Sequence, residues 1–232
     1  MGAEVIAART FQSLYIWLDL AFLAVFVALL IWQRRYQALL LGIIGGVLYF
    51  AVDYGIFLQA LGTRTITGAS PFWVLIWLSF SYGLTNFAWI WLLLDRDKHA
   101  LEWSLFIITG WLCVALLSQQ FGYDDAPIAT SRGTGQYHGV MALIMFLGYG
   151  WLIVRNLRKE QAAPILRILV IGILVQFSWE AVLAISGIRT FYWNTVIVNS
   201  LLETNMGLPY LYLIHKAMSR RWDEGMQRIA NG

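Results

Sequence analysis

The sequence of 232 residues has little charge: 12% of its residues are Asp, Glu, Lys or Arg, whereas 59% are hydrophobic. Soluble domains carry roughly 25% charged residues, so this chain has too few polar groups to cover a surface in water. It also has a single cysteine, Cys113, which excludes a disulfide framework and a cysteine-rich metal site. These absences exclude a soluble enzyme and a small secreted domain, and they leave an integral membrane protein.

The chain instead contains long apolar segments, and a membrane helix needs about 20 predominantly apolar residues. They predict an all-α fold, a polytopic membrane protein with seven transmembrane helices in one domain, 1–232. The predicted spans are roughly 13–32, 38–59, 72–94, 102–118, 138–154, 164–185 and 194–214. The N-terminus lacks the basic region and cleavage site of a signal peptide, so we expect the first span to be retained.

Lys and Arg divide unequally between the two ends of these spans. Twelve fall on one side: Arg34, Arg35, Arg96, Lys98, Arg155, Arg158, Lys159, Arg167, Lys216, Arg220, Arg221 and Arg228. The other four are Arg9, Arg64, Arg132 and Arg189. Positive residues collect in the cytoplasm, so the N-terminus is predicted outside and the C-terminus inside, in the cell membrane if the source is bacterial. The basic pI of about 9.1 then reflects attraction to membrane lipids rather than to nucleic acid.

Two parts of the chain resemble each other. Asp53-Tyr54 and, further on, 61–65 (LGTRT) in the first part match Trp179-Glu180 and 186–190 (SGIRT) in the second. We therefore predict a parallel repeat of three helices, about 12–94 and 138–215, joined by a linker helix at about 102–118. A cavity is expected between the two halves.

Four of the thirteen acidic residues lie inside predicted spans: Asp19, Asp53, Glu180 and Glu203. A carboxylate at the centre of a membrane helix costs about 2.5–3.5 kcal/mol, so such residues usually face a cavity and serve a function. At 1.5 Å of rise per residue, all four fall about 8–14 Å below the outer ends of their helices. They predict one polar pocket that opens toward the outer side.

The ionisation of these acids has two interpretations. Arg64 and Arg189, in the short outer loops, can reach down and pair with Asp53 or Glu180, which makes the acids structural. Other basic residues at this depth are not expected. An acid in an apolar site without a cation favours its neutral form and is then a proton donor.

Aromatic and amide side chains surround the acids in the sequence. The faces of aromatic rings attract cations by about 0.5–2 kcal/mol each, so rings beside a protonated carboxyl suit the formation and guidance of a carbocation. The residues predicted to bind the substrate are Asp19, Tyr49, Tyr54, Trp73, Trp77, Tyr82, Asn86, Phe177, Trp179, Asn199, Asn205 and Tyr210. Gly207-Leu208-Pro209 also predicts a break in the last span, just after Glu203.

The acids in the second and last spans, together with residues 203–210 (ETNMGLPY), resemble the small seven-helix membrane terpene cyclases of meroterpenoid and indole-terpenoid pathways, the pyripyropene and paxilline types and their bacterial relatives. The resemblance implies protonation of a terminal olefin or epoxide of a prenylated aromatic substrate, such as a farnesylated indole. It assigns the catalytic acids to Asp53 and Glu203. The family often has Trp-Glu in the second helix; here Trp179-Glu180 stands in the sixth, so Glu180 is a third candidate.

Neither a metal nor another cofactor is expected. Asp124-Asp125 is followed by Ala126-Pro127-Ile128-Ala129, so the DDxxD motif that holds magnesium on a diphosphate is absent. The alternative function is a proton-coupled transporter of small molecules, since intramembrane acids and three-helix repeats also occur there. A retinal protein is disfavoured because no lysine lies inside the last span.

Overall fold

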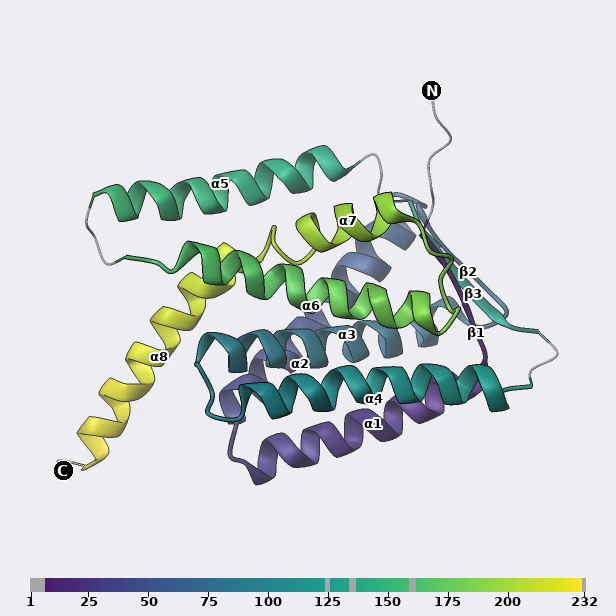
Figure 1. The fold of residues 1–232 in the computed structure, drawn as a ribbon, viewed down its shortest axis with the longest axis horizontal. Helices are drawn as coiled ribbons and strands as arrows, with labels where there is room; N and C mark the ends of the chain where they lie inside the picture. The colour runs from purple at the N-terminus through teal and green to yellow at the C-terminus, as the bar shows by residue number, and fades with distance from the viewer. Residues whose placement is uncertain (1–6, 124–125, 134–136, 159–161, 231–232) are drawn as a thin grey trace.

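The computed structural model describes residues 7–123, 126–133, 137–158 and 162–230. Asp124, Asp125 and Lys159 lie outside these ranges. The helices are α1 Ser13–Trp32, α2 Tyr36–Phe50, the π-helix η1 Ala51–Ala60, α3 Pro71–Leu94, α4 Ala100–Phe121, α5 His138–Leu157, α6 Ile165–Ile185, α7 Trp193–Leu202 and α8 Leu208–Ala230. Figure 1 shows α1, α3, α4, α5 and α6 side by side along the long axis of the molecule.

The helical, multi-pass membrane character that was predicted is confirmed. Within the described residues, six helices are long and apolar enough to cross a membrane: α1, α2 with η1, α3, α4, α5 and α6. Large apolar side chains such as Trp17, Phe146 and Leu166 lie about 70% exposed on their outer faces, as lipid-facing residues do. The parallel repeat and the orientation in the membrane stay predictions.

The last predicted span, 194–214, is not a single helix. Helix α7 ends at Leu202, turns occupy Glu203–Gly207, and α8 begins at Leu208. Pro209 lacks an N–H and clashes with a preceding helical turn, so a helix can begin at this point but cannot run through it. The predicted break is therefore present, and the seventh span stays a prediction.

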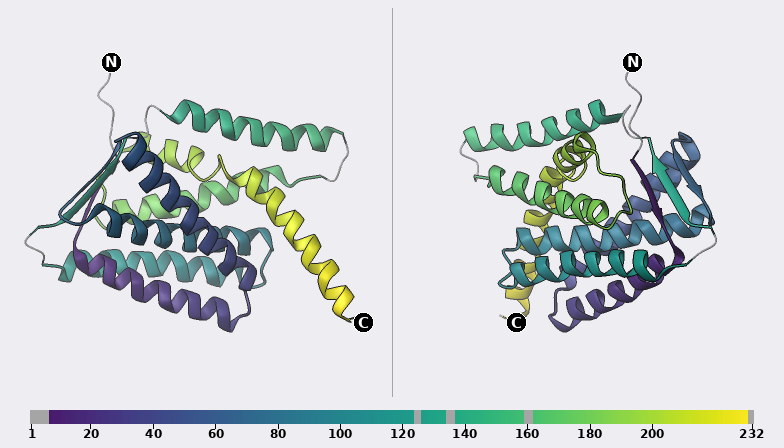
Figure 2. Two further views of the ribbon diagram at one scale, coloured as in Figure 1. Left: turned by 180° about the vertical axis from the view of Figure 1, so that it is seen from behind. Right: turned by 45° about the vertical axis from the view of Figure 1, so that its right-hand side comes forward.

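A small β-sheet, which the sequence analysis did not predict, closes one end of the bundle (Figures 1 and 2). Its antiparallel strands are β1 Ala7–Phe11, β2 Arg64–Thr67 and, between them, β3 Ile128–Arg132. Arg64 and Arg132 are paired in its register, Arg9 pairs with Thr130, and an isolated bridge joins Arg9 to Arg189. The sheet thus gathers the four arginines of the four loops at this end of the bundle.

Helix α3 forms the centre of the bundle, and 72% of its most apolar 18-residue stretch is buried. It packs closely on α2, where a Cβ on Gly83 would overlap the backbone of Gly46. The same helix carries Ser79, Tyr82 and Asn86 toward the sheet-covered end. The π-helix η1 continues α2 at its sheet end and buries Asp53 and Phe57. Helices of this type are rare and often occur at functional sites.

Candidate functional site

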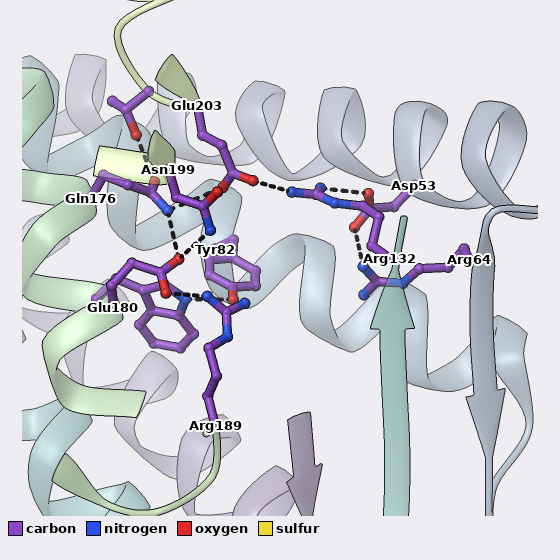
Figure 3. A network of polar contacts seen from close by, with 11 residues as sticks. Asp53, Arg64, Tyr82, Arg132, Gln176, Glu180, Arg189, Asn199 and Glu203 are labelled. Atoms are coloured by element: carbon purple, nitrogen blue, oxygen red, sulfur yellow. Dashed lines mark hydrogen bonds and ion pairs between the residues drawn. The ribbon is translucent and has the colours of Figure 1, made fainter. Parts of the chain in front are cut away.

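Two acids from distant parts of the chain share one arginine beneath the sheet (Figure 3). Asp53 lies in η1, and Glu203 is the first residue after α7. Arg132, at the end of β3, places its Nη1 3.1 Å from Asp53 Oδ1 and its Nη2 2.7 Å from Glu203 Oε1. One guanidinium therefore holds the two predicted catalytic carboxylates together.

Two further arginines complete the charge pairing. Arg64 Nη1 lies 3.7 Å from Asp53 Oδ2, and Arg189 forms an ion pair with Glu180, whose side chain is fully buried. The predicted reach of Arg64 and Arg189 is thus confirmed.

Two amide side chains connect Glu180 to Glu203. Gln176 Nε2 donates to Glu180 Oε1 at 3.2 Å and to Glu203 Oε2 at 3.1 Å, while its Oε1 accepts from Thr204. Asn199 Nδ2 donates to Glu180 Oε1 at 3.2 Å. Glu180 therefore has every oxygen engaged, and α6, α7 and the turn after α7 are held in one network.

Of the two interpretations of the intramembrane acids, the paired one describes this cluster. Asp53, Glu180 and Glu203 each have an arginine partner. The arginines respond in turn. Burial lowers the pKa of Arg64 to about 10, although Asp53 opposes this. Burial also lowers the pKa of Arg132, but Glu203 and Asp53 outweigh it and raise the pKa above its ordinary value.

Arg9 brings a fourth positive charge to the same place. Its guanidinium lies over the ring of Tyr82, 5.0 Å from the centroid, and 5.7 Å from that of Trp179. The Trp179 indole donates to the Tyr82 hydroxyl. Burial, with repulsion from Arg189 as the next cause, holds the pKa of Arg9 well below its ordinary value. Among the described residues the cluster therefore contains four guanidiniums and three carboxylates.

These side chains enclose a small cavity with about 40 Å³ of free space, enough for a few water molecules. It is lined by Arg9, Tyr49, Asp53, Arg64, Ser79, Tyr82, Asn86, Arg132, Gln176 and Glu203. Ser79 Oγ and Asn86 Oδ1 are buried and have no hydrogen-bond partner within the described chain. The lining therefore offers carboxylates, free polar atoms and tyrosine rings at one point.

Some of the predicted substrate residues line this cavity, and others lie outside its lining. Tyr49, Tyr82 and Asn86 line the cavity. A second group is buried or half-buried but lies outside the lining. Trp179 donates to the cavity residue Tyr82, whereas Asn199 donates to Glu180, which lies behind the lining. Asn205 accepts from Tyr149, Trp77 donates to Asp19, and the half-buried Tyr54 stacks on Phe50.

Three predicted substrate residues lie on the outside of the bundle. Trp73 is 68% exposed, Phe177 47% and Tyr210 41%. Tyr210 uses its hydroxyl to bond the Ile144 carbonyl. Phe177 and Tyr210 occur close to Glu180 and Glu203 in the sequence but lie on an outer face, because neighbours on a helix face different directions. Trp73 belongs to the aromatic helix α3 but is exposed on its outer side. The structure does not bring these three residues to the cavity.

The sequence analysis missed Arg132, Arg9, Gln176 and Ser79 as site residues. The signal for the arginines was present, since they are the few basic residues on the acid-bearing side of the predicted spans. Gln176 lies four residues before Glu180, a spacing that puts both on one helix face.

Comparison with protein-family models, with characterised proteins and with solved structures finds no match. Within the described residues, no group of three or more His, Cys, Asp and Glu side chains is placed to hold a metal ion. The function is therefore argued from the site itself.

Proposed function

We propose that the chain is a membrane-bound terpene cyclase. It protonates a terminal olefin or epoxide of a prenylated aromatic substrate, a farnesylated indole being our preferred class, and guides the cyclisation of the resulting cation. The observation that carries this proposal is the bridge from Asp53 through Arg132 to Glu203. The two acids that the resemblance assigns to catalysis come from distant helices and face the same cavity.

Proton transfer requires one of these acids to be neutral at the moment of reaction. At rest both acids are paired with Arg132. The cavity of about 40 Å³ is far smaller than a farnesyl chain, so substrate entry has to widen it. We propose that this widening separates Arg132 from one carboxylate, which then takes up the proton that it delivers.

Glu203 is the better candidate for the donor. Its side chain is 17% exposed, against 8% for Asp53, and it lies in the turns between α7 and α8 rather than inside a helix. Its O–H bond breaks as the proton passes to the terminal carbon of the olefin or to the epoxide oxygen. After ring closure, the neighbouring carboxylate accepts the proton that leaves the final cation. Glu180 is fully buried behind the cavity and acts as a positioning residue.

The rings of Tyr49 and Tyr82 supply the stabilisation of the cation. Their centroids lie 6.3 Å apart and both line the cavity. A cation over such a ring gains about 0.5–2 kcal/mol. The guanidinium of Arg9 already occupies this kind of place over Tyr82, which demonstrates that the ring is presented to a positive charge.

The proposed cyclisation is tested by a direct assay of product formation. Membranes that contain the protein are incubated with prenylated indoles and their epoxides, and products are separated by chromatography and mass. A new product of unchanged mass is expected from the wild type and from the control Glu102→Gln, an exposed acid that pairs with His99 and lies outside the cavity lining. Asp53→Asn and Glu203→Gln should each abolish the product while expression is kept. Full activity in both variants would refute the assignment.

The transporter alternative is favoured by one observation, the break between α7 and α8 at Glu203. Interrupted helices with polar groups at membrane depth are common at the binding sites of transporters. Uptake of the same compounds into vesicles without chemical change would support this alternative.

For the membrane topology we propose seven crossings, with α7 and the first turns of α8 forming the last one. The N-terminus is placed outside, the C-terminus in the cytoplasm, and the halves are related by the parallel repeat. The support is that the connections bearing Arg34, Arg35, Arg96 and Lys98 lie at the end of the bundle away from the sheet. Labelling of single cysteines from either side of the membrane tests this orientation.

A further inference from the structure

The end of the bundle away from the sheet contains a second and larger cavity of about 340 Å³. It lies between the turn that joins α1 to α2, the end of α3, and α8. Its lining consists of Arg34, Arg35, Tyr36, Gln37, Ala38, Leu92, Asp95 and Ser219. None of these residues belongs to the candidate catalytic site.

Two arginines bring positive charge to this cavity. Arg35 Nε lies 2.5 Å from Asp97 Oδ2, so its charge is balanced. Arg34 has no ion pair or side-chain hydrogen bond in the part of the chain that the structure describes. Its φ of 57° places it in the left-handed region, which residues other than glycine adopt infrequently. The cavity therefore presents one cation without a direct partner among the described residues, held in an unusual backbone conformation.

Uncharged hydrogen-bond donors face the same space. Helix α2 begins at Tyr36 without a side-chain cap, and the first N–H groups of a helix have no partner within it. The residues of this first turn, Tyr36 to Ala38, line the cavity. On the opposite wall, Ser219 Oγ is buried without a hydrogen-bond partner within the described chain. Helix N-termini and arginines together favour the binding of phosphate.

Aromatic residues in this part of the chain indicate where that phosphate comes from. Tyr36, in the lining, is 52% exposed, and Trp32, at the end of α1, is 74% exposed. These residue types collect at the level of lipid headgroups. Basic pockets between membrane helices bind lipid headgroups. Asp95 adds an acceptor: it lines the cavity while one of its oxygens contacts His215 at 2.6 Å.

We propose that this cavity binds the phosphate of a membrane phospholipid. The phosphodiester contacts Arg34, the first turn of α2 and Ser219, and the headgroup donates hydrogen bonds to Asp95. Ethanolamine and glycerol headgroups have such donors, whereas choline has none, so phosphatidylethanolamine and phosphatidylglycerol bind in preference to phosphatidylcholine. The proposal does not rest on the cyclase assignment.

The test uses the full chain, purified in detergent and freed of lipid. Retention of each of the three lipids is measured by native mass spectrometry, and thermal stability is measured with and without lipid. Arg34→Gly removes the guanidinium while relieving the left-handed backbone, so the lipid-free protein stays folded. The matched control is Lys98→Ala, which removes an exposed positive charge at the same end from outside the cavity lining.

We expect Arg34→Gly to weaken retention of the ethanolamine and glycerol lipids by about tenfold, as loss of one charge-assisted hydrogen bond does, and Lys98→Ala to leave it unchanged. Ser219→Ala should also weaken retention. Equal retention of all three lipids, unaffected by Arg34→Gly, would overturn the proposal. Inorganic phosphate in place of lipid is the further arm: if it stabilises the protein as much as lipid does, the ligand is a soluble phosphate compound and the lipid proposal is wrong.

Discussion

Glu180 and Asp19 are both inaccessible acids on membrane-spanning helices, with 0% and 1% of their surface exposed, yet their surroundings differ. Glu180 faces the guanidinium of Arg189 and two amide donors, Gln176 and Asn199. Asp19 Oδ2 accepts a hydrogen bond from the indole of Trp77 at 2.8 Å and has no cation partner within the described chain. Burial alone therefore does not decide what an intramembrane acid does, because the loops decide which acids receive an arginine.

The surroundings of Asp19 and Glu180 also differ in their aromatic side chains. Near Asp19 the rings of Phe11, Tyr15 and Trp77 pack at centroid distances of 5.4–5.7 Å. Asp19 is thus the only one of the four intramembrane acids that occupies the predicted setting, aromatic and without a cation. The three acids of the polar cluster each have an arginine partner, whereas Asp19 joins α1 to α3 through Trp77.

The largest loss of stability is expected when the ion pair between Arg189 and Glu180 is broken. Arg189→Met leaves the charge of Glu180 buried without its cation, so the free energy of unfolding should fall by about 3–5 kcal/mol. Adding Glu180→Gln removes that charge and should restore most of the loss. Thermal unfolding in detergent, followed by tryptophan fluorescence, measures both. If the single variant is as stable as the wild type, the ion pair has no structural role.

A smaller loss of stability is expected at Asp19, which has no cation partner within the described chain. Trp77→Phe keeps an aromatic ring but removes the indole N–H that donates to Asp19, leaving the side-chain hydrogen bond from Ser81. This should lower the free energy of unfolding by about 1–3 kcal/mol. Trp73→Phe is the matched control on the same helix. Because Trp73 is 68% exposed, its replacement should change stability by no more than about 0.5 kcal/mol. Equal losses in the two variants would show that the hydrogen bond to Asp19 contributes nothing.

The smallest loss of stability is expected when Asp19 is replaced by its amide, and the same change at Glu180 allows the two acids to be compared directly. Asp19→Asn keeps an oxygen that accepts from Trp77 and leaves no cation without a partner, so we expect a loss below about 1 kcal/mol. The matched change Glu180→Gln leaves Arg189 without its carboxylate and should be clearly more destabilising. The same melting experiment measures both. A loss from Asp19→Asn as large as that from Glu180→Gln would mean that the two acids have equivalent roles.

The sequence predicted those parts of the fold that depend on neighbouring residues. The apolar segments gave six of the helices that can span a membrane, and Gly207 and Pro209 gave the break after Glu203. The depth of the four acids in their spans predicted one shared pocket. Asp53 and Glu203 line one cavity, Glu180 contacts it through Gln176, and Asp19 lies outside it.

The remaining features depend on pairing across long distances in the chain. Arg132 reaches Asp53 and Glu203 because β3 lies between β1 and β2, and no local pattern specifies a sheet made from three separate loops. The direction of each side chain was also not predictable from proximity in sequence, so Trp73 and Phe177 were placed in the site. The π-helix at Asp53 has no distinct residue preference that would have predicted it.

The sheet has a consequence for the order in which the protein is made. Asp53 is synthesised 79 residues before Arg132, and Glu203 follows Arg132 by 71 residues. At about 5–20 residues per second, Asp53 waits roughly 4–16 s for the guanidinium that bridges it, and Glu203 has that guanidinium waiting. When the second span enters the membrane, Arg64 in the loop that follows it is the cation available to Asp53. The bridge to Glu203 can form only after the third strand and the last helices have been made.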